Sequence, residues 1–172
     1  PRMEEGWRRM PAQYKHRHYP DITHMVRAQY PVTWWDPAFG MTLGRECINP
    51  RPIFESALHN YYAPLSDGFL TYSDGVHDDV NKVIWSLSAW DPKMPVRDQV
   101  LAYTRTFFGA KVAKEAADGI LALEKNWEGP IAENGGIDAT LALWDALDEK
   151  APELRDNWRW QMCQLRAVYD AY

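Results

Sequence analysis

Three carboxylates and one imidazole that could take part in acid–base chemistry stand within the segment SDGVHDDVNK, residues 73–82. They are Asp74, His77, Asp78 and Asp79. Carboxylates that lie close together are the groups that general acid–base catalysis uses most often, beside histidine. The segment therefore predicts either a catalytic loop or a helix start.

The helix-start interpretation rests on the pattern that follows. A carboxylate placed just before an apolar-periodic run accepts hydrogen bonds from the free N–H groups of a first helical turn. Capping explains one or both of Asp78 and Asp79. It does not explain Asp74 and His77 beside them. It also does not explain Asn81 and Lys82, which we expect to point away from the apolar stripe. We assign Asp74, Asp78 and Asp79 as candidate catalytic groups, and the neighbouring candidates for substrate binding are His77, Asn81 and Lys82.

A second polar segment is YKHRHYPDITH, residues 14–24. Its side chains are of the types that hydrogen-bond polyhydroxylated ligands, which makes it a candidate sugar or carboxylate site built from Arg17, His18, Asp21 and His24. The alternative is a metal site. On an extended strand His16 and His18 share one face, and Asp21 could complete a ligand set for a metal-dependent hydrolase. We favour the sugar site, and we predict no metal and no cofactor.

Two further candidates lie between these segments. The guanidinium group of Arg45 has the geometry to hold an anionic substrate group, although a surface ion pair with Glu46 accounts for it equally simply. Trp34 and Trp35 are adjacent on an extended segment and must face opposite ways, so one of them can serve as a stacking platform for a sugar ring. We assign that role to Trp35.

The first half of the chain must position these groups with short elements. Residues 1–75 contain eight of the 12 prolines, which interrupt long helices. PIFESALHNYYAPL, residues 52–65, is a helix candidate with an apolar stripe of Ile53, Ala57 and Tyr61. DGFLTYSDG, residues 67–75, follows as a short strand between glycines. Strand, helix and strand in succession predict a parallel sheet or barrel.

The second half has a helical pattern from residue 78 onward. We expect helix ends at Asp91-Pro92, at Gly109 and at Lys150-Ala151-Pro152. The tryptophans that fall on the apolar stripes, and that we therefore expect in the core, are Trp90, Trp144 and Trp158. Consecutive amphipathic helices joined by short turns predict an antiparallel arrangement.

Composition limits the class of protein. Hydrophobic residues make up 46% of the 172 residues, which is enough for a core. A net charge of −5 argues against nucleic acid as a partner, and no apolar run reaches the length that crosses a membrane. The two cysteines lie far apart in the sequence, which argues against a disulfide framework. The sequence leaves the compartment open, and a periplasmic or secreted parent protein is compatible with it.

Six segments of the chain carry a resemblance to a known family: RHYPDITHMVRAQYPV, WDPAFGMTLGRECINPRP, SDGVHDDVNKVIWSLSAWDP, YTRTFFG, LEKNWEGP and NWRWQMCQLRAVYDAY. Together they resemble the last third of large bacterial glycoside-hydrolase-like proteins. The segment DDVNKVIWSLSAWDP also looks like the part that follows the barrel in α-glucuronidase-like and hexosaminidase-like enzymes. The resemblance implies a mainly α chain with a small α/β part. Residues 1–75 would close a (β/α)8 barrel, and residues 76–172 would hold its last helix and a helical C-terminal region.

The same resemblance implies a function. The chain would be part of an enzyme that hydrolyses glycosidic bonds by carboxylate chemistry, and its partners would be a carbohydrate and a missing N-terminal part of the same protein. Asp21, His24, Asp74 and the Asp78/Asp79 pair would line the sugar pocket. The carboxylate pair of such enzymes often comes from middle strands, so the isolated chain is expected to be inactive. The alternative from a different class is a non-catalytic helical interaction module.

Overall fold

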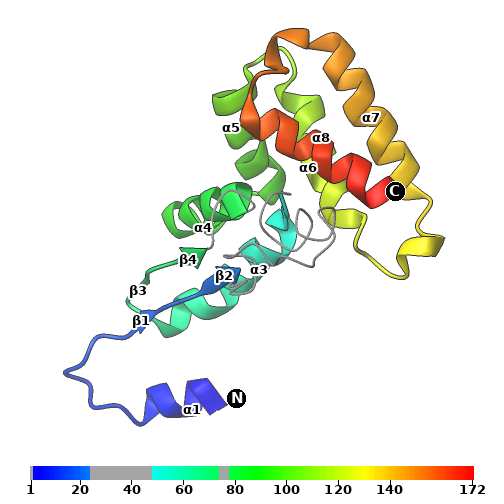
Figure 1. The fold of residues 1–172 in the computed structure, drawn as a ribbon. Coiled ribbons are helices and arrows are strands. Elements are labelled where there is room, and N and C mark those ends of the chain that lie inside the picture. Colours follow the sequence, from blue (N-terminus) through cyan, green and yellow to red (C-terminus); the bar gives the residue numbers. More distant parts are fainter. Residues whose placement is uncertain (1, 24–47, 74–77) are drawn as a thin grey trace, which may run out of the picture.

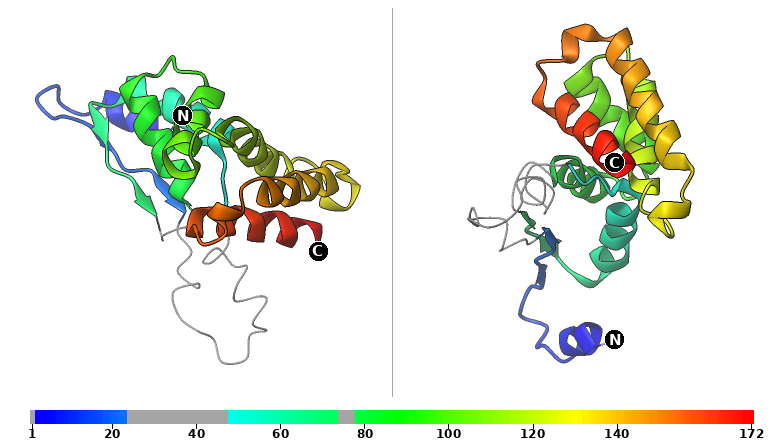
Figure 2. Two further views of the ribbon diagram at one scale, coloured as in Figure 1. Left: turned by 90° about the horizontal axis from the view of Figure 1, so that it is seen from above. Right: turned by 45° about the vertical axis from the view of Figure 1, so that its right-hand side comes forward.

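The computed structural model describes residues 2–23, 48–73 and 78–172, and this part of the chain is mainly helical (Figure 1). His24, Trp35, Arg45, Asp74 and His77 lie outside the described residues. Figure 2 shows the arrangement in two further views, with the N-terminal helix at one end of the molecule and the C-terminal helices at the other. Within the described residues, no helix is long and apolar enough to cross a membrane.

Two short pairs of parallel strands form the α/β part. β1 (Arg17–His18) pairs with β3 (Gly68–Phe69), and β2 (Asp21–Thr23) pairs with β4 (Tyr72–Ser73). Between them the chain runs through α3 (Pro52–Tyr62) and the short 3-10 helix η2 (Ala63–Leu65). Parallel neighbours need such a crossover connection. The predicted succession of strand, helix and strand is therefore confirmed, whereas a closed barrel goes beyond what these strands show.

The rest of the described chain consists of helices. α1 (Arg2–Arg8) precedes the strands, and the helices that follow them are α4 (Asp79–Trp90), α5 (Val96–Phe108), α6 (Ala113–Lys125), α7 (Gly136–Lys150) and α8 (Trp158–Ala171). Two further 3-10 turns are η4 (Ile131–Glu133) and η5 (Pro152–Leu154). From α5 to α8, each helix packs on the next along the chain.

The predicted helix ends are confirmed. α4 stops before Asp91-Pro92, and α7 stops at Lys150 before Pro152. Gly109 follows α5 with a φ of 84°, a backbone conformation that glycine adopts without the steric cost other residues meet. Asn157 caps the N-terminus of α8, because its side-chain oxygen accepts hydrogen bonds from the N–H groups of Arg159 (3.0 Å) and Trp160 (3.4 Å).

One hydrophobic core joins α4 to α8, and its largest side chains are aromatic. Trp144 and Trp160 are fully buried with ring centroids 5.3 Å apart, as the prediction for Trp144 required. The prediction is wrong for Trp90, which is 86% exposed, and for Trp158, which is 40% exposed. Trp158 is the first residue of α8, and the buried face of this helix carries Trp160 and Cys163 instead.

Helix α3 is turned the opposite way from its predicted orientation. Ile53, Ala57 and Tyr61 were expected to face the core, but all three are exposed. The buried face carries Glu55, Ser56 and His59 instead. The reason is that α4 offers polar partners to this face: Ser88 donates a hydrogen bond to Ser56 (3.3 Å), and Trp85 donates one to Glu55 (2.7 Å).

The α/β part is attached to the helical part at the start of α3. Glu124, near the end of α6, accepts hydrogen bonds from the backbone N–H groups of Ile53 (2.8 Å) and Phe54 (2.9 Å). A carboxylate at this position satisfies free N–H groups and interacts favourably with the positive end of the helix dipole. Burial raises the pKa of Glu124, and the two N–H groups oppose that effect. Residues on both sides of the proposed boundary at residue 75 are thus in direct contact.

The close contact between α6 and α7 at Gly119 gives a prediction. A Cβ atom at residue 119 would lie 3.0 Å from the ring of Trp144, which is fully buried. We expect Gly119→Ala to lower the free energy of unfolding by about 1–3 kcal/mol, although alanine favours helices, because the indole ring has no room to move. Urea unfolding measures this. Gly135→Ala is the control, because nothing lies within 4 Å of its Cβ position. Equal stability of Gly119→Ala and the wild type would contradict this packing.

Candidate functional site

A buried polar network lies where β2 ends, α3 begins and α4 begins. We call it the Arg51 network, and its members are Arg51, Glu55, Asp78, Asn81 and Trp85. Arg51 Nη2 donates a hydrogen bond to the carbonyl oxygen of Ile22 in β2 (3.2 Å). The same atom forms an ion pair with Glu55 Oε1 (3.1 Å), one helical turn further along the chain. The guanidinium group therefore ties strand β2 to helix α3.

Glu55 is a deeply buried carboxylate of this network that carries both an ion pair and a hydrogen bond. It is 1% exposed, and the indole N–H of Trp85 donates a hydrogen bond to its Oε2 atom. Burial raises the pKa of Glu55, while the hydrogen bond from Trp85 and the charge of Arg51 act against this. A buried charge is tolerated only when it is paired and hydrogen-bonded, and Glu55 has both kinds of partner.

Asn81 connects the segment before α3 to the start of α4. Its Oδ1 accepts a hydrogen bond from the backbone N–H of Arg51 (2.8 Å), and its Nδ2 donates to the carbonyl oxygen of Asn49 (2.9 Å). Nδ2 also donates to Asp78 Oδ1 (3.3 Å). Asn81 was expected to point away from the apolar stripe into a substrate site. It is fully buried instead and holds two chain segments together.

The acidic pair at the start of α4 divides between two surroundings. α4 begins at Asp79, as predicted, but the Asp78 side chain makes no capping hydrogen bond to the described first turn and is fully buried beside Asn81. Asp79 faces α5 and α8, where it accepts hydrogen bonds from Tyr103 Oη (2.7 Å) and Arg159 Nε (2.7 Å). Half-buried Lys82 lies on the same helix. Asp78 and Asp79 therefore do not form a single carboxylate pair.

Arg159 is enclosed by aromatic rings as well as by charge. Its guanidinium carbon lies 3.8 Å from the ring centroid of Phe107 and 4.1 Å from that of Trp158. Burial raises the pKa of Tyr103 strongly, and the nearby Asp79 carboxylate adds to this. This arrangement is typical of a structural contact that fastens α4 to α5 and α8.

Arg17 and His18 lie in β1, at the opposite end of the paired strands from Thr23. Arg17 is exposed. His18 stacks on Tyr62 with ring centroids 4.9 Å apart and lies 6.0 Å from Trp85. Burial, and secondarily His59, lowers the pKa of His18. The backbone of Asp21 begins β2. The described residues therefore do not bring Arg17 and His18 to the strand end from which the chain continues to His24.

The described side chains also bear on the requirements of a metal site, the alternative for the segment around His16 and His18. Among the described side chains, no group of three His, Cys, Asp or Glu residues could hold a metal ion.

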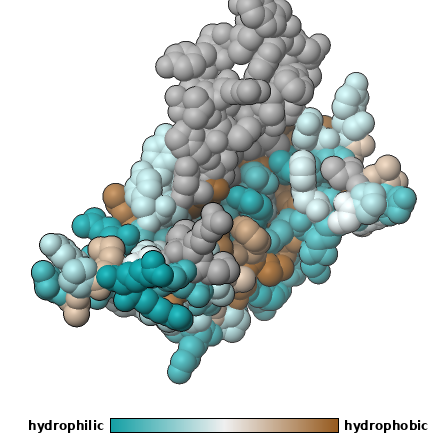
Figure 3. Space-filling model, turned by 90° about the horizontal axis from the view of Figure 1, so that it is seen from below, coloured by the Kyte–Doolittle hydropathy of each residue, from teal (hydrophilic) through white to brown (hydrophobic). Residues whose placement is uncertain are grey.

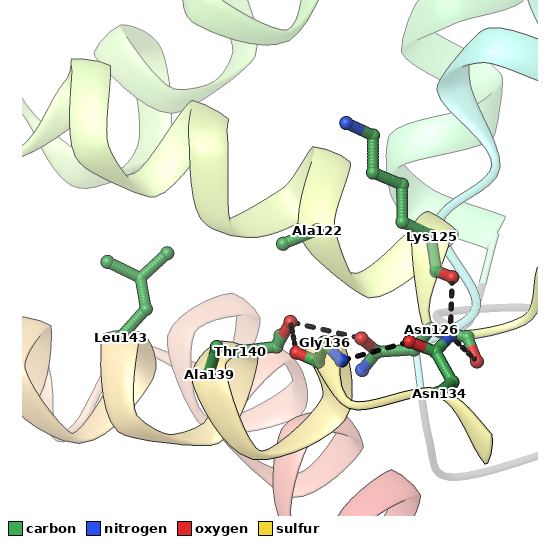
Figure 4. Close-up of a pocket in the computed structure, with 8 residues that line it drawn as sticks. All are labelled: Ala122, Lys125, Asn126, Asn134, Gly136, Ala139, Thr140 and Leu143. Carbon is green, nitrogen blue, oxygen red and sulfur yellow. Dashed lines mark hydrogen bonds between the residues drawn. The ribbon is translucent and has the colours of Figure 1, made fainter. Parts of the chain in front are cut away.

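A groove of about 260 Å³ runs between α6 and α7, with Ala122, Ala139 and Leu143 along one part and polar residues at one end (Figure 4). The side-chain amide of Asn134 donates hydrogen bonds to backbone carbonyls, including that of Lys125 (3.0 Å). The polar end of the groove therefore stabilises the loop between α6 and α7.

Sequence reasoning missed Arg51, Glu55 and Trp85, and the signal for them was weak. Polar residues recur at positions 55, 56 and 59 on one helical face, which ordinarily indicates a solvent-exposed face.

Comparison with models of known protein families, with curated proteins and with solved structures found no match for this chain.

The raised pKa of Glu55 predicts how stability depends on pH. A carboxyl group whose pKa is raised by folding stabilises the protein fully below the ordinary value of 4.5, and this contribution is lost as pH rises through the folded-state pKa. We therefore expect the stability of Glu55→Gln relative to the wild type to increase as pH rises from 4 to 7. Urea unfolding of both proteins across this range measures it. A difference that stays constant with pH would contradict the assignment.

The Asp79–Arg159 contact predicts a structural role for Asp79. Asp79→Ala removes one member of an ion pair whose side chains are 18% and 22% exposed, and leaves Arg159 without its carboxylate. We expect a loss of roughly 2–4 kcal/mol in the free energy of unfolding. Asp118→Ala breaks the exposed pair with Arg97 and is the matched control, with an expected loss of less than about 1 kcal/mol. Similar losses in the two variants would refute the distinction.

Proposed function

We propose that this chain is the C-terminal part of a carbohydrate-active enzyme that hydrolyses glycosidic bonds, and that it supplies closing units of a (β/α)8 barrel. The observation that carries the proposal is the parallel pairing of β2 with β4, in which Thr23 is the partner of Ser73. The next residues in the sequence are His24 and Asp74. Two of the groups suited to acid–base chemistry therefore follow directly from paired strand positions.

The strand direction supports a site at this edge. The carboxyl ends of parallel strands meet at the same edge of a sheet, and active sites of α/β proteins form there. Thr23 and Ser73 are register partners, so the chain leaves β2 and β4 at the same edge. Asp74 is our candidate catalytic carboxylate, and His24 is a candidate to bind the sugar beside it.

The Arg51 network holds the residues next to this strand edge in place. Arg51 holds the carbonyl of Ile22, one residue before the paired Thr23, and Asn81 holds Asp78 and the backbone of Arg51 together. The end of β2 and the start of α4 are thus connected by one set of hydrogen bonds that are buried or partly buried. Catalytic groups need positions held by such supporting contacts. We assign Arg51, Asn81 and Asp78 as positioning residues.

The chemistry requires a second carboxylate. In glycoside hydrolysis one carboxylic acid protonates the leaving oxygen, and a second carboxylate acts as nucleophile or activates water. A separation of about 5 Å between the two would give retention, and a wider one would give inversion. Asp79 is paired with Arg159 and Tyr103, so the second carboxylate would come from another strand of the parent protein.

The test is hydrolysis of a panel of p-nitrophenyl glycosides by the longest protein that the reading frame encodes. Asp74→Asn should lower kcat/KM by about 100-fold or more, because it removes a general acid or base. Asp91→Asn, at an exposed position after α4, is the control and should leave kcat/KM unchanged. Full activity of Asp74→Asn would remove this residue from the mechanism. No hydrolysis and no glycan binding by the parent protein would refute the proposed function in favour of a helical interaction module.

A further inference from the structure

Two imidazole rings and four aromatic rings form one cluster where α1, β1, β3, α3 and α4 meet. We call it the ring cluster, and its members are Trp7, His18, His59, Tyr62, Phe69 and Trp85. His18 stacks on Tyr62 with ring centroids 4.9 Å apart. The Trp7 ring stands nearly perpendicular to both of these rings, 6.2 Å from each. The helix α1 is therefore held to β1 and α3 by the contacts of one indole.

The two imidazole rings share one neighbour. The Trp85 ring lies 6.0 Å from His18 and 5.2 Å from His59. His59 is 3% exposed and His18 is half-buried. A charge on either imidazole would be enclosed by apolar rings with little contact to water, and charges on both would repel each other. The ring cluster thus favours the neutral form of both imidazoles.

Carboxylates on the elements around the ring cluster have other partners. These partners are Tyr61 for Glu4, Arg9 for Glu5, Trp85 and Arg51 for Glu55, Lys15 for Asp67, Asn81 for Asp78, and Arg159 for Asp79. Among the described residues, no carboxylate pairs with the imidazole of His18 or of His59. Arg8 on α1 and Arg17 on β1 are exposed and add positive charge to the elements that carry Trp7 and His18. An imidazolium in the ring cluster would therefore lack a counter-charge.

The dependence on pH follows from these surroundings. Burial lowers the pKa of His18, and the neighbouring His59 lowers it further. A histidine whose pKa is lowered by folding stabilises the folded arrangement fully above its ordinary value of 6.5. This contribution is lost as pH falls through the lower folded-state pKa. Mild acid therefore weakens the contacts around His18.

The helix α1 is the covering element that can move. It has seven residues, and a helix of that length is not stable by itself in water. It contacts the α/β part through Trp7 and through Glu4, which accepts the hydrogen bond from Tyr61 (2.7 Å). Figure 3 shows the molecule from below, the side at which α1 lies in Figure 1, with hydrophobic surface near the middle and hydrophilic residues around it. Departure of α1 would uncover the ring of Tyr62 as well.

We propose that His18 is a pH-sensitive latch for α1. The neutral ring holds Trp7 against Tyr62, and the imidazolium, which gains water when Trp7 leaves, releases α1 together with the linker of residues 9–14. The movement ends at His16, whose backbone N–H donates a hydrogen bond to the Asp67 carboxylate (2.9 Å). Mild acid then uncovers His18 and Tyr62 while the strands stay paired. The inference does not rest on the proposed glycosidase chemistry.

The experiment follows the distance from α1 to α6 with two nitroxide labels in the 172-residue chain. Gly6→Cys and Lys114→Cys place the labels at exposed positions, and nothing lies within 4 Å of a Cβ atom at residue 6. Cys47 is replaced by serine, whereas Cys163 is buried and can stay. The distance distribution from pulsed EPR should be at least about twice as broad at about pH 5 as at about pH 7.5, because released α1 samples many positions.

Two variants assign the response to one ring. His18→Phe keeps an aromatic ring that cannot take up a proton, so its distance distribution should stay narrow at both pH values. His16→Gln is the matched control. It removes an imidazole outside the ring cluster but keeps the backbone N–H that binds Asp67, and it should respond to pH as the wild type does.

Four results would overturn the inference. The wild type could show the same narrow distribution at both pH values, or a distribution that is already broad at the higher one. A broadening that persists in His18→Phe would assign the response to another group. Loss of the helical circular dichroism signal at the lower pH would show unfolding of the whole chain instead of release of α1.

Discussion

The ion pair between Arg51 and Glu55 is the interaction on which the α/β part depends. Glu55 cannot be buried without a cation and a hydrogen-bond donor, and Arg51 and Trp85 supply them at 3.1 Å and 2.7 Å. Arg51 also donates a hydrogen bond to the carbonyl of Ile22 in β2, and Trp85 on α4 donates one to Glu55, so these contacts link α3 to strand β2 and to helix α4. The rings of His59 and Phe69, which pack on Trp85, add aromatic contacts to this polar anchoring.

This polar anchoring has two consequences. With its polar face buried, α3 turns Ile53, Phe54 and Tyr61 outward to solvent. With β2 held beside β4, the chain leaves the two strands at one edge, towards His24 and Asp74. The helical part contributes a different kind of contact. Its core of Trp144 and Trp160 is apolar, and it is joined to the α/β part through the Glu124 carboxylate.

The sequence predicted most of the local structure but not which face of each helix is buried. Gly109, Asp91-Pro92 and Pro152 mark helix ends through their backbone chemistry, which acts locally, so these boundaries were predictable. The face of α3 was not, because burying Glu55 depends on Trp85, 30 residues away in the sequence. In the same way the loop carrying Asp78 and Asp79 suggested one acidic site. The structure sends Asp78 towards Asn81 and Asp79 towards Arg159, a division that only tertiary contacts determine.

The most direct test of the central interaction is urea unfolding of Arg51→Met and Glu55→Gln, alone and combined, in the 172-residue chain. Because the two side chains form one ion pair, the loss in the free energy of unfolding of the double variant should be smaller than the sum of the two single losses by about 1 kcal/mol or more. Losses that simply add would contradict the account.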